Sequence, residues 1–261
     1  MKKTLISSVP ADIPRELLPY IKDSRIFDSS SSPEARVYYV ERGGYYLKRA
    51  VGGSLEKEAL MTEYFHSKGL GTEVLEYLTS GGEDFLLTAK MRGEDCTSDI
   101  FLTSPERLCD TIAEELRILH GLDYSGCPIM NRTEVYIKTA LENYKSGNYD
   151  SSHFPDSFGY SSAEEAIAVL REGRDVLRSD TLIHGDYCLP NIILDGWGLA
   201  GFIDLGNAGV ADRHIDLFWG AWTLGFNLGT DKYRERFFDA YGRDRVDKYA
   251  LKVVAAAEVF G

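Results

Sequence analysis

The sequence predicts an α+β fold in which a strand-rich part, residues 1–92, precedes a mainly helical part, residues 93–261. Short runs rich in β-branched and aromatic residues, bounded by glycine-containing turns, recur within residues 36–89. From about residue 104 onward, apolar residues recur instead at the spacing of an amphipathic helix. The change in periodicity therefore predicts two domains with a boundary close to residue 92.

In the first part, two pairs of strands are expected on either side of one helix. The turn at residues 41–44 contains two glycines and joins the first pair as a hairpin. The helix is expected over residues 54–67, with Ser54 as its N-cap. The expected strands are residues 36–40, 45–49, 73–78 and 83–89.

In the second part, Pro105 suits a first helical turn, and Ile112, Leu116 and Leu119 form an apolar stripe. Residues 146–162 are rich in serine, glycine, aspartate and tyrosine, which indicates a loop. Further helices are expected near residues 133–146, 161–178, 212–226, 231–241 and 244–259.

The charge balance limits the class of partner. The chain has 29 basic and 41 acidic side chains, for a formal net charge of −12. Nucleic acids need a basic surface to neutralise their phosphates, so we expect no nucleic-acid partner. An acidic surface instead suits a small cationic substrate. Because 44% of the residues are apolar, the chain can bury a substantial core.

The four cysteines are scattered and show no spacing typical of zinc or redox sites; they are Cys96, Cys109, Cys127 and Cys188. The apolar run near the N-terminus is too short for a signal peptide, and no stretch is long enough to span a membrane. We therefore expect a cytoplasmic protein without membrane contact, as a monomer or weak dimer.

The most informative segment is HGDYCLPN at residues 184–191, followed by IDLG at residues 203–206. These motifs contain two carboxylates, Asp186 and Asp204, and one carboxamide, Asn191. Phosphoryl transfer needs such a set, because one carboxylate orients and deprotonates an alcohol while two oxygen ligands hold Mg²⁺. Hard Mg²⁺ prefers oxygen ligands, so we expect no zinc site.

The residues between the two motifs predict a hairpin. Ile192, Ile193 and Leu194 indicate a short buried strand, and the Asp195-Gly196 pair is typical of a hairpin turn. The return strand ends near residues 202–203. Asn191 and Asp204 then lie at the same open end of the hairpin.

The combination H-G-D-x-x-x-x-N and I-D-x-G resembles the H-R-D-x-x-x-x-N and D-F-G motifs of protein kinases. The longer strings around it are most similar to the aminoglycoside 3′-phosphotransferases. The similarity is strongest over residues 181–217 and weaker over residues 36–94. It implies a two-lobed, protein-kinase-like fold, with a β-rich nucleotide-binding N-terminal lobe and a larger, mainly helical C-terminal lobe for catalysis and substrate binding.

The resemblance also implies a reaction and its cofactors. The γ-phosphate of ATP or GTP would pass directly to a hydroxyl group of an aminoglycoside antibiotic, giving resistance. Asp186 would act as the catalytic base, and Asn191 and Asp204 would hold Mg²⁺. His184 and Asp216 are expected to hold the loop in place rather than to take part in the chemistry.

In the N-terminal lobe, the resemblance assigns Lys48 to the nucleotide phosphates. A carboxylate on the following helix should pair with it. Glu56, Glu58 and Glu63 are all candidates, and alignment with the family pattern favours Glu58.

Other nucleotide contacts follow from the same resemblance. Tyr46 corresponds to the aromatic residue that stacks on adenine, although a Tyr packed within the lobe fits equally well. Ser31 and Ser32 correspond to a serine-containing phosphate loop, or else to a plain linker. The C=O of Ala89 and the N–H of Met91 would contact the adenine edge.

The acceptor side departs from the family. Asp156, Trp222 and Glu258 are our substrate-binding candidates, and polar or acidic family positions are replaced by Asn207, Trp222, Phe226 and Ala257. We therefore expect narrower or weaker aminoglycoside binding. Two alternatives remain open: a kinase of another small alcohol, such as a different antibiotic or a metabolite, and a nucleotide-binding protein without turnover.

Overall fold

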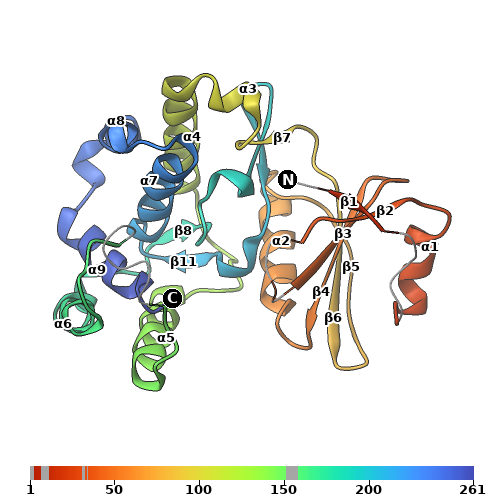
Figure 1. Ribbon diagram of the computed structural model, residues 1–261, viewed down its shortest axis with the longest axis horizontal. Coiled ribbons are helices and arrows are strands. Elements are labelled where there is room, and N and C mark those ends of the chain that lie inside the picture. Colours follow the sequence, from red (N-terminus) through yellow and green to blue (C-terminus); the bar gives the residue numbers. More distant parts are fainter. Residues whose placement is uncertain (1–2, 7–11, 31–32, 34, 151–157) are drawn as a thin grey trace. The chain divides into compact units, whose positions relative to one another are not determined.

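A computed structural model describes residues 3–6, 12–30, 33, 35–150 and 158–261 (Figure 1). The chain divides into two compact units, and each is described by itself. The first comprises Met1–Asp95 and Pro190–Asn207; the second comprises Cys96–Leu189 and Ala208–Gly261. The α+β prediction is confirmed. Residues 93–95 and 190–207 lie with the first unit, whereas the expected lobes were 1–92 and 93–261, and that functional division stays a prediction.

The first unit is built on an antiparallel six-stranded sheet of order β1-β2-β3-β4-β6-β5. The two expected pairs of strands form the neighbours β3-β4 and β6-β5, and two short N-terminal strands, β1 and β2, extend the sheet beyond β3. The strands are β1 (Thr4–Leu5), β2 (Ile26–Asp28), β3 (Ala35–Val40), β4 (Tyr45–Val51), β5 (Val74–Ser80) and β6 (Glu83–Ala89). The sequence analysis missed β1 and β2, which are too short to show a period.

Alternation along β4 gives the sheet two different faces. Leu47 points into a core with Leu17, Phe85 and Leu87, next to the short helix α1 (Leu18–Ile21). Tyr46 and Lys48 lie on the opposite face of the strand, as their even spacing requires. The candidate nucleotide residues therefore share one face of the sheet.

Helix α2 (Glu56–Ser67) begins two residues later than expected. Ser54 is not its N-cap, because the Ser54 hydroxyl donates to the carbonyl of Val51 instead. The backbone N–H of Leu55 donates to the buried carboxylate of Asp84, at 2.9 Å. A distant side chain on β6 therefore satisfies the helix start, which the local sequence could not reveal.

A second sheet in the first unit has the order β10-β9-β7. Strands β9 (Ile192–Asp195) and β10 (Gly198–Phe202) form the expected hairpin, and β7 (Glu94–Asp95) pairs with β9. Phe202 packs edge-on against Phe65 of α2, with ring centroids 6.2 Å apart. The hairpin is thereby fixed to the helix that carries Glu58.

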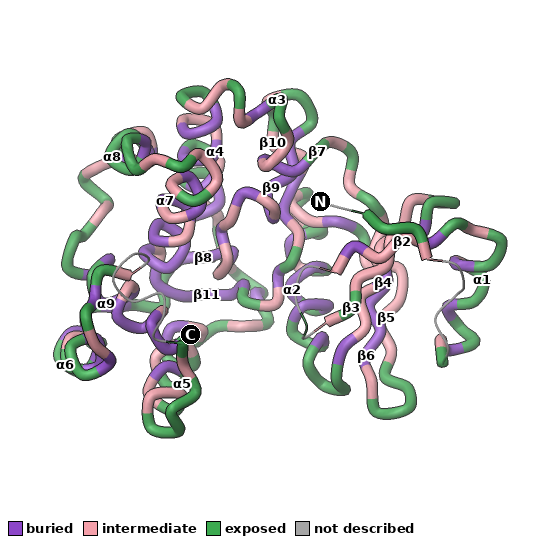
Figure 2. The backbone as a smooth tube through the Cα atoms, in the orientation of Figure 1, coloured by how far each residue is buried: buried purple, intermediate pink, exposed green. Residues whose placement is uncertain are grey.

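The second unit is mainly helical, with a two-stranded pair of β8 (Thr181–Ile183) and β11 (Gly209–Ala211). All six residues of this pair are buried (Figure 2). The helices are α3 (Asp99–Leu102), α4 (Pro105–Leu119), α5 (Arg132–Ser146), α6 (Ala163–Gly173), α7 (His214–Leu228), α8 (Arg234–Tyr241) and α9 (Lys248–Glu258). Within the described ranges, none of the chain's helices has the length and apolar character needed to cross a membrane.

Two helix boundaries differ from expectation because side chains cap the helices. Ser162 accepts a hydrogen bond from the Glu165 N–H at the start of α6, and the helix gives way to a 3₁₀ turn after Gly173. Asp247 accepts from the N–H groups of Tyr249 and Ala250, so α9 starts after residue 247 rather than at 244. Each cap satisfies backbone donors that a helix end leaves unpaired.

Candidate active site

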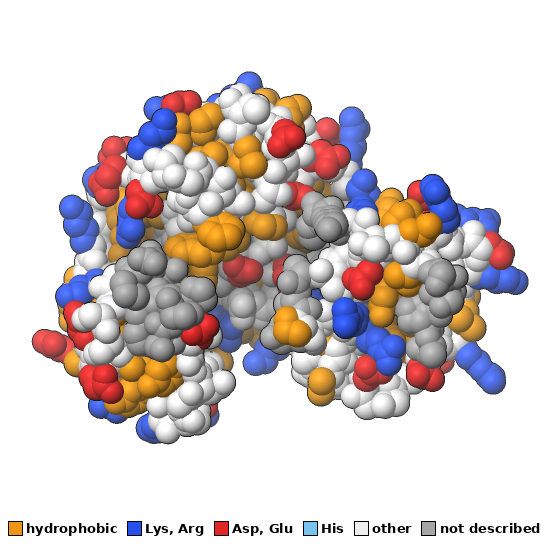
Figure 3. Space-filling view, viewed as in Figure 1, with side chains coloured by type: hydrophobic (Ala, Val, Ile, Leu, Met, Phe, Trp, Pro, Cys, Tyr) orange, Lys and Arg blue, Asp and Glu red, His pale blue; other side chains and the backbone are white. Residues whose placement is uncertain are grey.

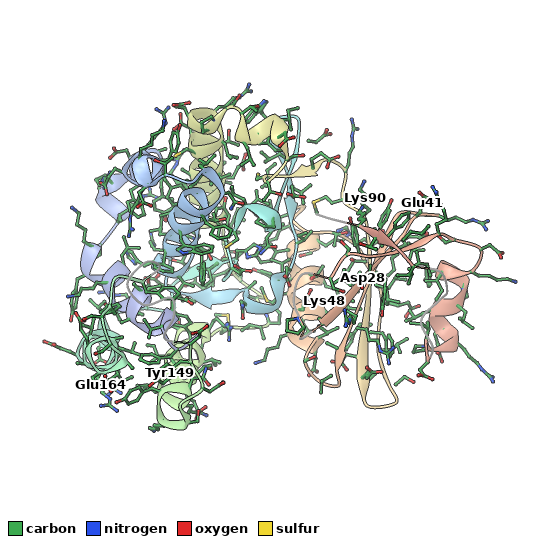
Figure 4. The ribbon with its side chains drawn as sticks, in the orientation of Figure 1. Asp28, Glu41, Lys48, Lys90, Tyr149 and Glu164 are labelled. Carbon is green, nitrogen blue, oxygen red and sulfur yellow. The ribbon has the colours of Figure 1, made fainter. Side chains whose placement is uncertain are left out.

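Lys48 in the first unit lies between two carboxylates. Its Nζ is 2.7 Å from Oε2 of Glu58 and 2.7 Å from Oδ1 of Asp204. Lys48 comes from β4 (Figure 4), Glu58 from α2, and Asp204 from the segment after β10. Glu58 is buried, whereas Glu56 and Glu63 are exposed on the same helix. Of the three candidates, Glu58 is therefore the one that makes the ion pair.

The electrostatics of this cluster keep the lysine charged. Burial alone would lower the pKa of Lys48, but the neighbouring Asp204 and Glu58 carboxylates outweigh it and raise the pKa. The side chain keeps about a fifth of its surface exposed, at 20%. A fixed ammonium that is still reachable is suited to bind an anionic ligand such as a phosphate.

Asn191 and Asp204 lie at the open end of the β9–β10 hairpin, as expected. The backbone N–H of Ile203 donates to the Asn191 carbonyl at 3.0 Å, so the two chain ends lie side by side. Asp204 has a φ of 59°, which is uncommon for a residue other than glycine and is often found at functional positions. The following 3₁₀ turn, Leu205–Asn207, packs on α2.

The donor set at this end of the hairpin fits a hard divalent cation. Asn191 offers an amide oxygen and Asp204 a half-exposed carboxylate, which are ligand types that Mg²⁺ accepts while it retains water. Among the described residues there is no cluster of three or more His, Cys, Asp or Glu side chains arranged for a metal. Two protein ligands together with substrate phosphates are a common arrangement for Mg²⁺.

Among the other nucleotide candidates in the first unit, Tyr46 lies on the face of β4 that carries Lys48, whereas Ala89 of β6 pairs with Tyr45. The ring of Tyr46 lies 5.1 Å from that of Tyr39, and Lys3 Nζ lies 5.2 Å from the Tyr46 centroid.

The Ala89 carbonyl accepts from the Thr72 hydroxyl, which leaves it one lone pair for another donor. The Met91 side chain lies against Gly201. Ser31 and Ser32 fall outside the described residues.

In the second unit, the loop that carries Asp186 is held by backbone hydrogen bonds. The Asp216 carboxylate accepts from the N–H groups of His184 and Gly185, at 2.8 and 2.7 Å. The N–H of Asp186 donates to Nδ1 of His184 at 3.2 Å. The predicted structural roles of His184 and Asp216 are therefore confirmed. Further along the loop, the N–H of Leu189 donates to the Thr223 hydroxyl at 3.1 Å.

The sequence analysis missed two residues that support this loop. His120 lies within 3.1 Å of Asp216 Oδ2 through Nε2 and within 2.8 Å of the Tyr241 hydroxyl through Nδ1. Burial lowers the pKa of His120, so the ring is neutral and makes a directional hydrogen bond rather than a charge pair. The available signal was weak: a histidine that continues the apolar stripe of α4.

Glu258 is partly buried in the second unit, beside two hydrogen-bond donors. Its Oε1 accepts from the Tyr136 hydroxyl at 2.7 Å and from Trp219 Nε1 at 3.0 Å. Burial, with a contribution from the Asp186 charge, raises the pKa of Glu258 to about 7, although both hydrogen bonds oppose the shift. Glu258 is thus close enough to Asp186 for its pKa to respond to the Asp186 charge.

Trp222 belongs to a group of aromatic side chains on α7. Its ring is stacked on that of Phe226, with centroids 4.9 Å apart and planes 12° apart. It also meets Trp219 edge-on at 5.3 Å. The third acceptor candidate, Asp156, lies outside the described residues. The structure thus brings Glu258 and Trp222 together through Trp219.

Comparison with known proteins relates the whole chain to one family. The model of the phosphotransferase enzyme family matches residues 30–251. A probable aminoglycoside 3′-phosphotransferase of Lactococcus lactis subsp. lactis (strain IL1403) is 52% identical over 249 residues, covering 95% of both sequences. The crystal structure of the aminoglycoside-3′-phosphotransferase of type VIII matches with a TM-score of 0.72 and 25% identity, covering 89% of this chain and 92% of that one.

A further solved structure has the same fold. It is an aminoglycoside phosphotransferase from Streptomyces rimosus in complex with ADP and streptomycin, with a TM-score of 0.69 and 24% identity, covering 87% of this chain and 91% of that one. The kinase-like fold expected from the sequence motifs is therefore confirmed.

Proposed function

The chain belongs to the phosphotransferase enzyme family, and on this premise we propose that it transfers the γ-phosphate of ATP or GTP to a hydroxyl group of an aminoglycoside. One observation carries the proposal: Lys48 is held at 2.7 Å from both Glu58 and Asp204. A buried carboxylate, Glu58, fixes the direction of the ammonium group. Asp204 is half exposed, so its contact with Lys48 can be replaced when nucleotide and a divalent cation bind. Phosphate oxygens would then contact Lys48, and the cation would contact Asp204.

Asp186 is the group that we assign to the acceptor hydroxyl. Its carboxylate would accept the hydrogen bond of the hydroxyl and take its proton as the oxygen attacks the γ-phosphorus. The anchoring of its loop by Asp216 and Thr223 supports this role, because catalysis requires the base to be held in one position. Asn191 and Asp204 would hold Mg²⁺, which supplies charge stabilisation at the phosphates when bound.

The remaining nucleotide contacts are assigned to the base and the phosphates. Tyr46 would stack on the purine, and the backbone of Ala89 and Met91 would bind its edge. Ser31 and Ser32 would contact phosphate oxygens. These assignments rest on the shared sheet face of Tyr46 and Lys48 and on the family pattern.

On the acceptor side, we assign Glu258, Trp222 and Asp156 to the aminoglycoside. A cationic acceptor is favoured by the net charge of −12 and by the neighbouring carboxyl groups of Asp186 and Glu258. The aromatic side chains of α7 offer contacts that do not require an opposite charge, so a less highly charged alcohol is the alternative acceptor. Assays with both kinds of acceptor distinguish an aminoglycoside from a less highly charged alcohol as the substrate.

The test is a nucleotide-consumption assay with ATP or GTP, Mg²⁺ and a panel of acceptors: kanamycin, neomycin, streptomycin and the uncharged alcohol inositol. We expect transfer to at least one aminoglycoside, with a phosphorylated product detected by mass spectrometry. Phosphorus NMR of that product identifies the hydroxyl. Turnover with inositol alone would overturn the aminoglycoside assignment and leave phosphoryl transfer in place.

The role of Asp186 is tested by Asp186→Asn, with Asp175→Asn as a matched control. Asp175 lies in the same unit with its side chain 93% exposed. Loss of a general base lowers kcat by about 10²–10⁴-fold. Nucleotide affinity should hardly change in Asp186→Asn, since this carboxylate is not assigned to the metal. A kcat close to that of Asp175→Asn would remove Asp186 from its assigned role.

A further inference from the structure

Four aromatic residues follow one side of helix α7 in the second unit. Phe218 and Trp219 are followed by Trp222 and Phe226 at spacings of three and four, which place side chains in a row along a helix. The row is continuous: successive ring centroids lie 5.4, 5.3 and 4.9 Å apart. It ends at Phe226, whose surface is 71% exposed.

This row is continuous with the groups that we assign to the reaction. Trp219 donates to Glu258, and the charge of Asp186 contributes to the raised pKa of Glu258. Thr223, next to Trp222 on α7, accepts the N–H of Leu189 from the loop of Asp186. The helix that positions the catalytic loop therefore also carries the aromatic row.

The same helix has no free carboxylate to offer an ammonium group. The ionisable residues of α7 are His214 and Asp216, and both are buried and hydrogen-bonded within the unit. Asn227, beside Phe226, donates its amide to the Thr223 carbonyl. A ligand on this face therefore meets ring faces and edges from α7, and the carboxylates nearest to the row, Asp231 against Gly225 and Glu258 beside Trp219, come from outside this helix.

Hydrophobic side chains also reach the surface of this unit in the region where α7 is drawn (Figure 3). A single exposed apolar residue needs no explanation, but Phe226 is supported by a stack of three further rings. A stacked ring loses little conformational freedom when a ligand binds, so it is suited to recognition.

We propose that Trp222 and Phe226 form an aromatic wall of the acceptor site, on which an aminated ring of the acceptor packs. This inference rests on the proposed function and deepens it. A protonated amine on or beside the ring is attracted to the aromatic face, and the ring's C–H groups bury the apolar surface. The acceptor is thus selected partly by contact with the aromatic rings of Trp222 and Phe226, in place of some contacts with carboxylates.

The wall is tested by Phe226→Ala and by the conservative variant Phe226→Tyr. We expect Phe226→Ala to raise KM for the acceptor by about 2- to 30-fold, the range of a cation–π contact, with KM for nucleotide unchanged. Phe226→Tyr should restore the wild-type value. Ile118→Ala is the control, because Ile118 is an apolar residue of α4 with 48% exposure, away from the row.

Two acceptors that differ in one amine sharpen the test. Neomycin carries an amine where paromomycin carries a hydroxyl, and the wall predicts that Phe226→Ala narrows the preference of the enzyme between them. Quenching of tryptophan fluorescence, in a Trp197→Phe background and without nucleotide, measures acceptor binding directly. The two tryptophans that remain, Trp219 and Trp222, both belong to the row and should report it.

Two results would overturn the wall. One is an acceptor KM in Phe226→Ala equal to that of Ile118→Ala. The other is a change in sedimentation velocity in Phe226→Ala with no change in acceptor binding, which would make this face a contact between copies of the chain. If the panel contains no aminoglycoside substrate but another alcohol is turned over, the proposed function fails and the wall is tested with that alcohol.

Discussion

Removing the positive charge of Lys48 should destabilise the first unit by an amount that depends on pH. In Lys48→Met, Glu58 keeps its carboxylate in a site where its side chain is only 10% exposed and has lost its cation. Breaking a buried ion pair by removing one partner costs about 3–5 kcal/mol. The contact to Asp204 adds little, because that side chain is 50% exposed and solvent screens it.

The dependence on pH follows from the protonation of Glu58. Without Lys48, burial raises the folded-state pKa of this carboxyl further above its unfolded value. Because the pKa of the acid is raised in the folded state, the folded state binds more protons than the unfolded state. The free energy of unfolding therefore decreases as pH rises from the unfolded-state pKa to the folded-state pKa. The deficit of Lys48→Met relative to the wild type should therefore be small near pH 5 and largest above pH 7.

The assay is urea denaturation followed by circular dichroism across this pH range. Lys57→Met, at an exposed position of α2, is the matched control. Adding Glu58→Gln to Lys48→Met should recover much of the lost free energy of unfolding and flatten its pH dependence, as a double-mutant cycle measures. If Lys48→Met and Lys57→Met unfold alike at pH 7.5, the reasoning about a buried pair is wrong.

Three further predictions concern the hairpin, the acceptor side and the loop support. Asp204→Asn should weaken Mg²⁺-dependent nucleotide binding and turnover together; isothermal titration with and without Mg²⁺ checks this, and an unchanged Mg²⁺ dependence would contradict the ligand assignment. For Glu258, the folded-state pKa of about 7 exceeds the usual 4.5, so the free energy of unfolding of the wild type decreases as pH rises from about 4.5 to about 7. Glu258→Gln keeps both hydrogen bonds without that fall, and should gain up to about 3 kcal/mol relative to the wild type by pH 8 in urea titrations; parallel pH curves would refute it. Tyr241→Phe should lower the free energy of unfolding by about 1 kcal/mol through loss of its hydrogen bond to His120, and an unchanged midpoint would show that this contact contributes nothing.

The sequence was most informative where chemistry and local structure coincide. The β9–β10 hairpin could be predicted because buried residues flank a glycine turn signal, but the turn is formed by Gly196 and Trp197 rather than by the expected Asp195-Gly196, since Asp195 pairs with Gly198. The pairing of Lys48 with Glu58 could be narrowed to three glutamates, and helix geometry explains the outcome. Glu58 faces the sheet, whereas Glu56 and Glu63 point to solvent.

Features that depend on distant partners could not be predicted. The start of α2 is set by Asp84, twenty-nine positions along the chain from the Leu55 N–H that it accepts. The His120–Asp216 contact joins residues from two helices, and no local pattern marks either one as a support for the loop. Strands β8 and β11 have three residues each, too few for a period to emerge.

The composition of the first unit has a consequence for how the chain is made. Strand β7 pairs with β9, and Lys48 pairs with Asp204. Both contacts can form only after residues 96–189 have been synthesised. The residues of the six-stranded sheet therefore leave the ribosome long before those of the β9–β10 hairpin, which completes the first unit. Contacts of such large sequence separation form slowly, because a long loop must close first. A fragment ending at residue 95 would carry the lysine of the cluster without the aspartate, so the Lys48 cluster is completed late in synthesis.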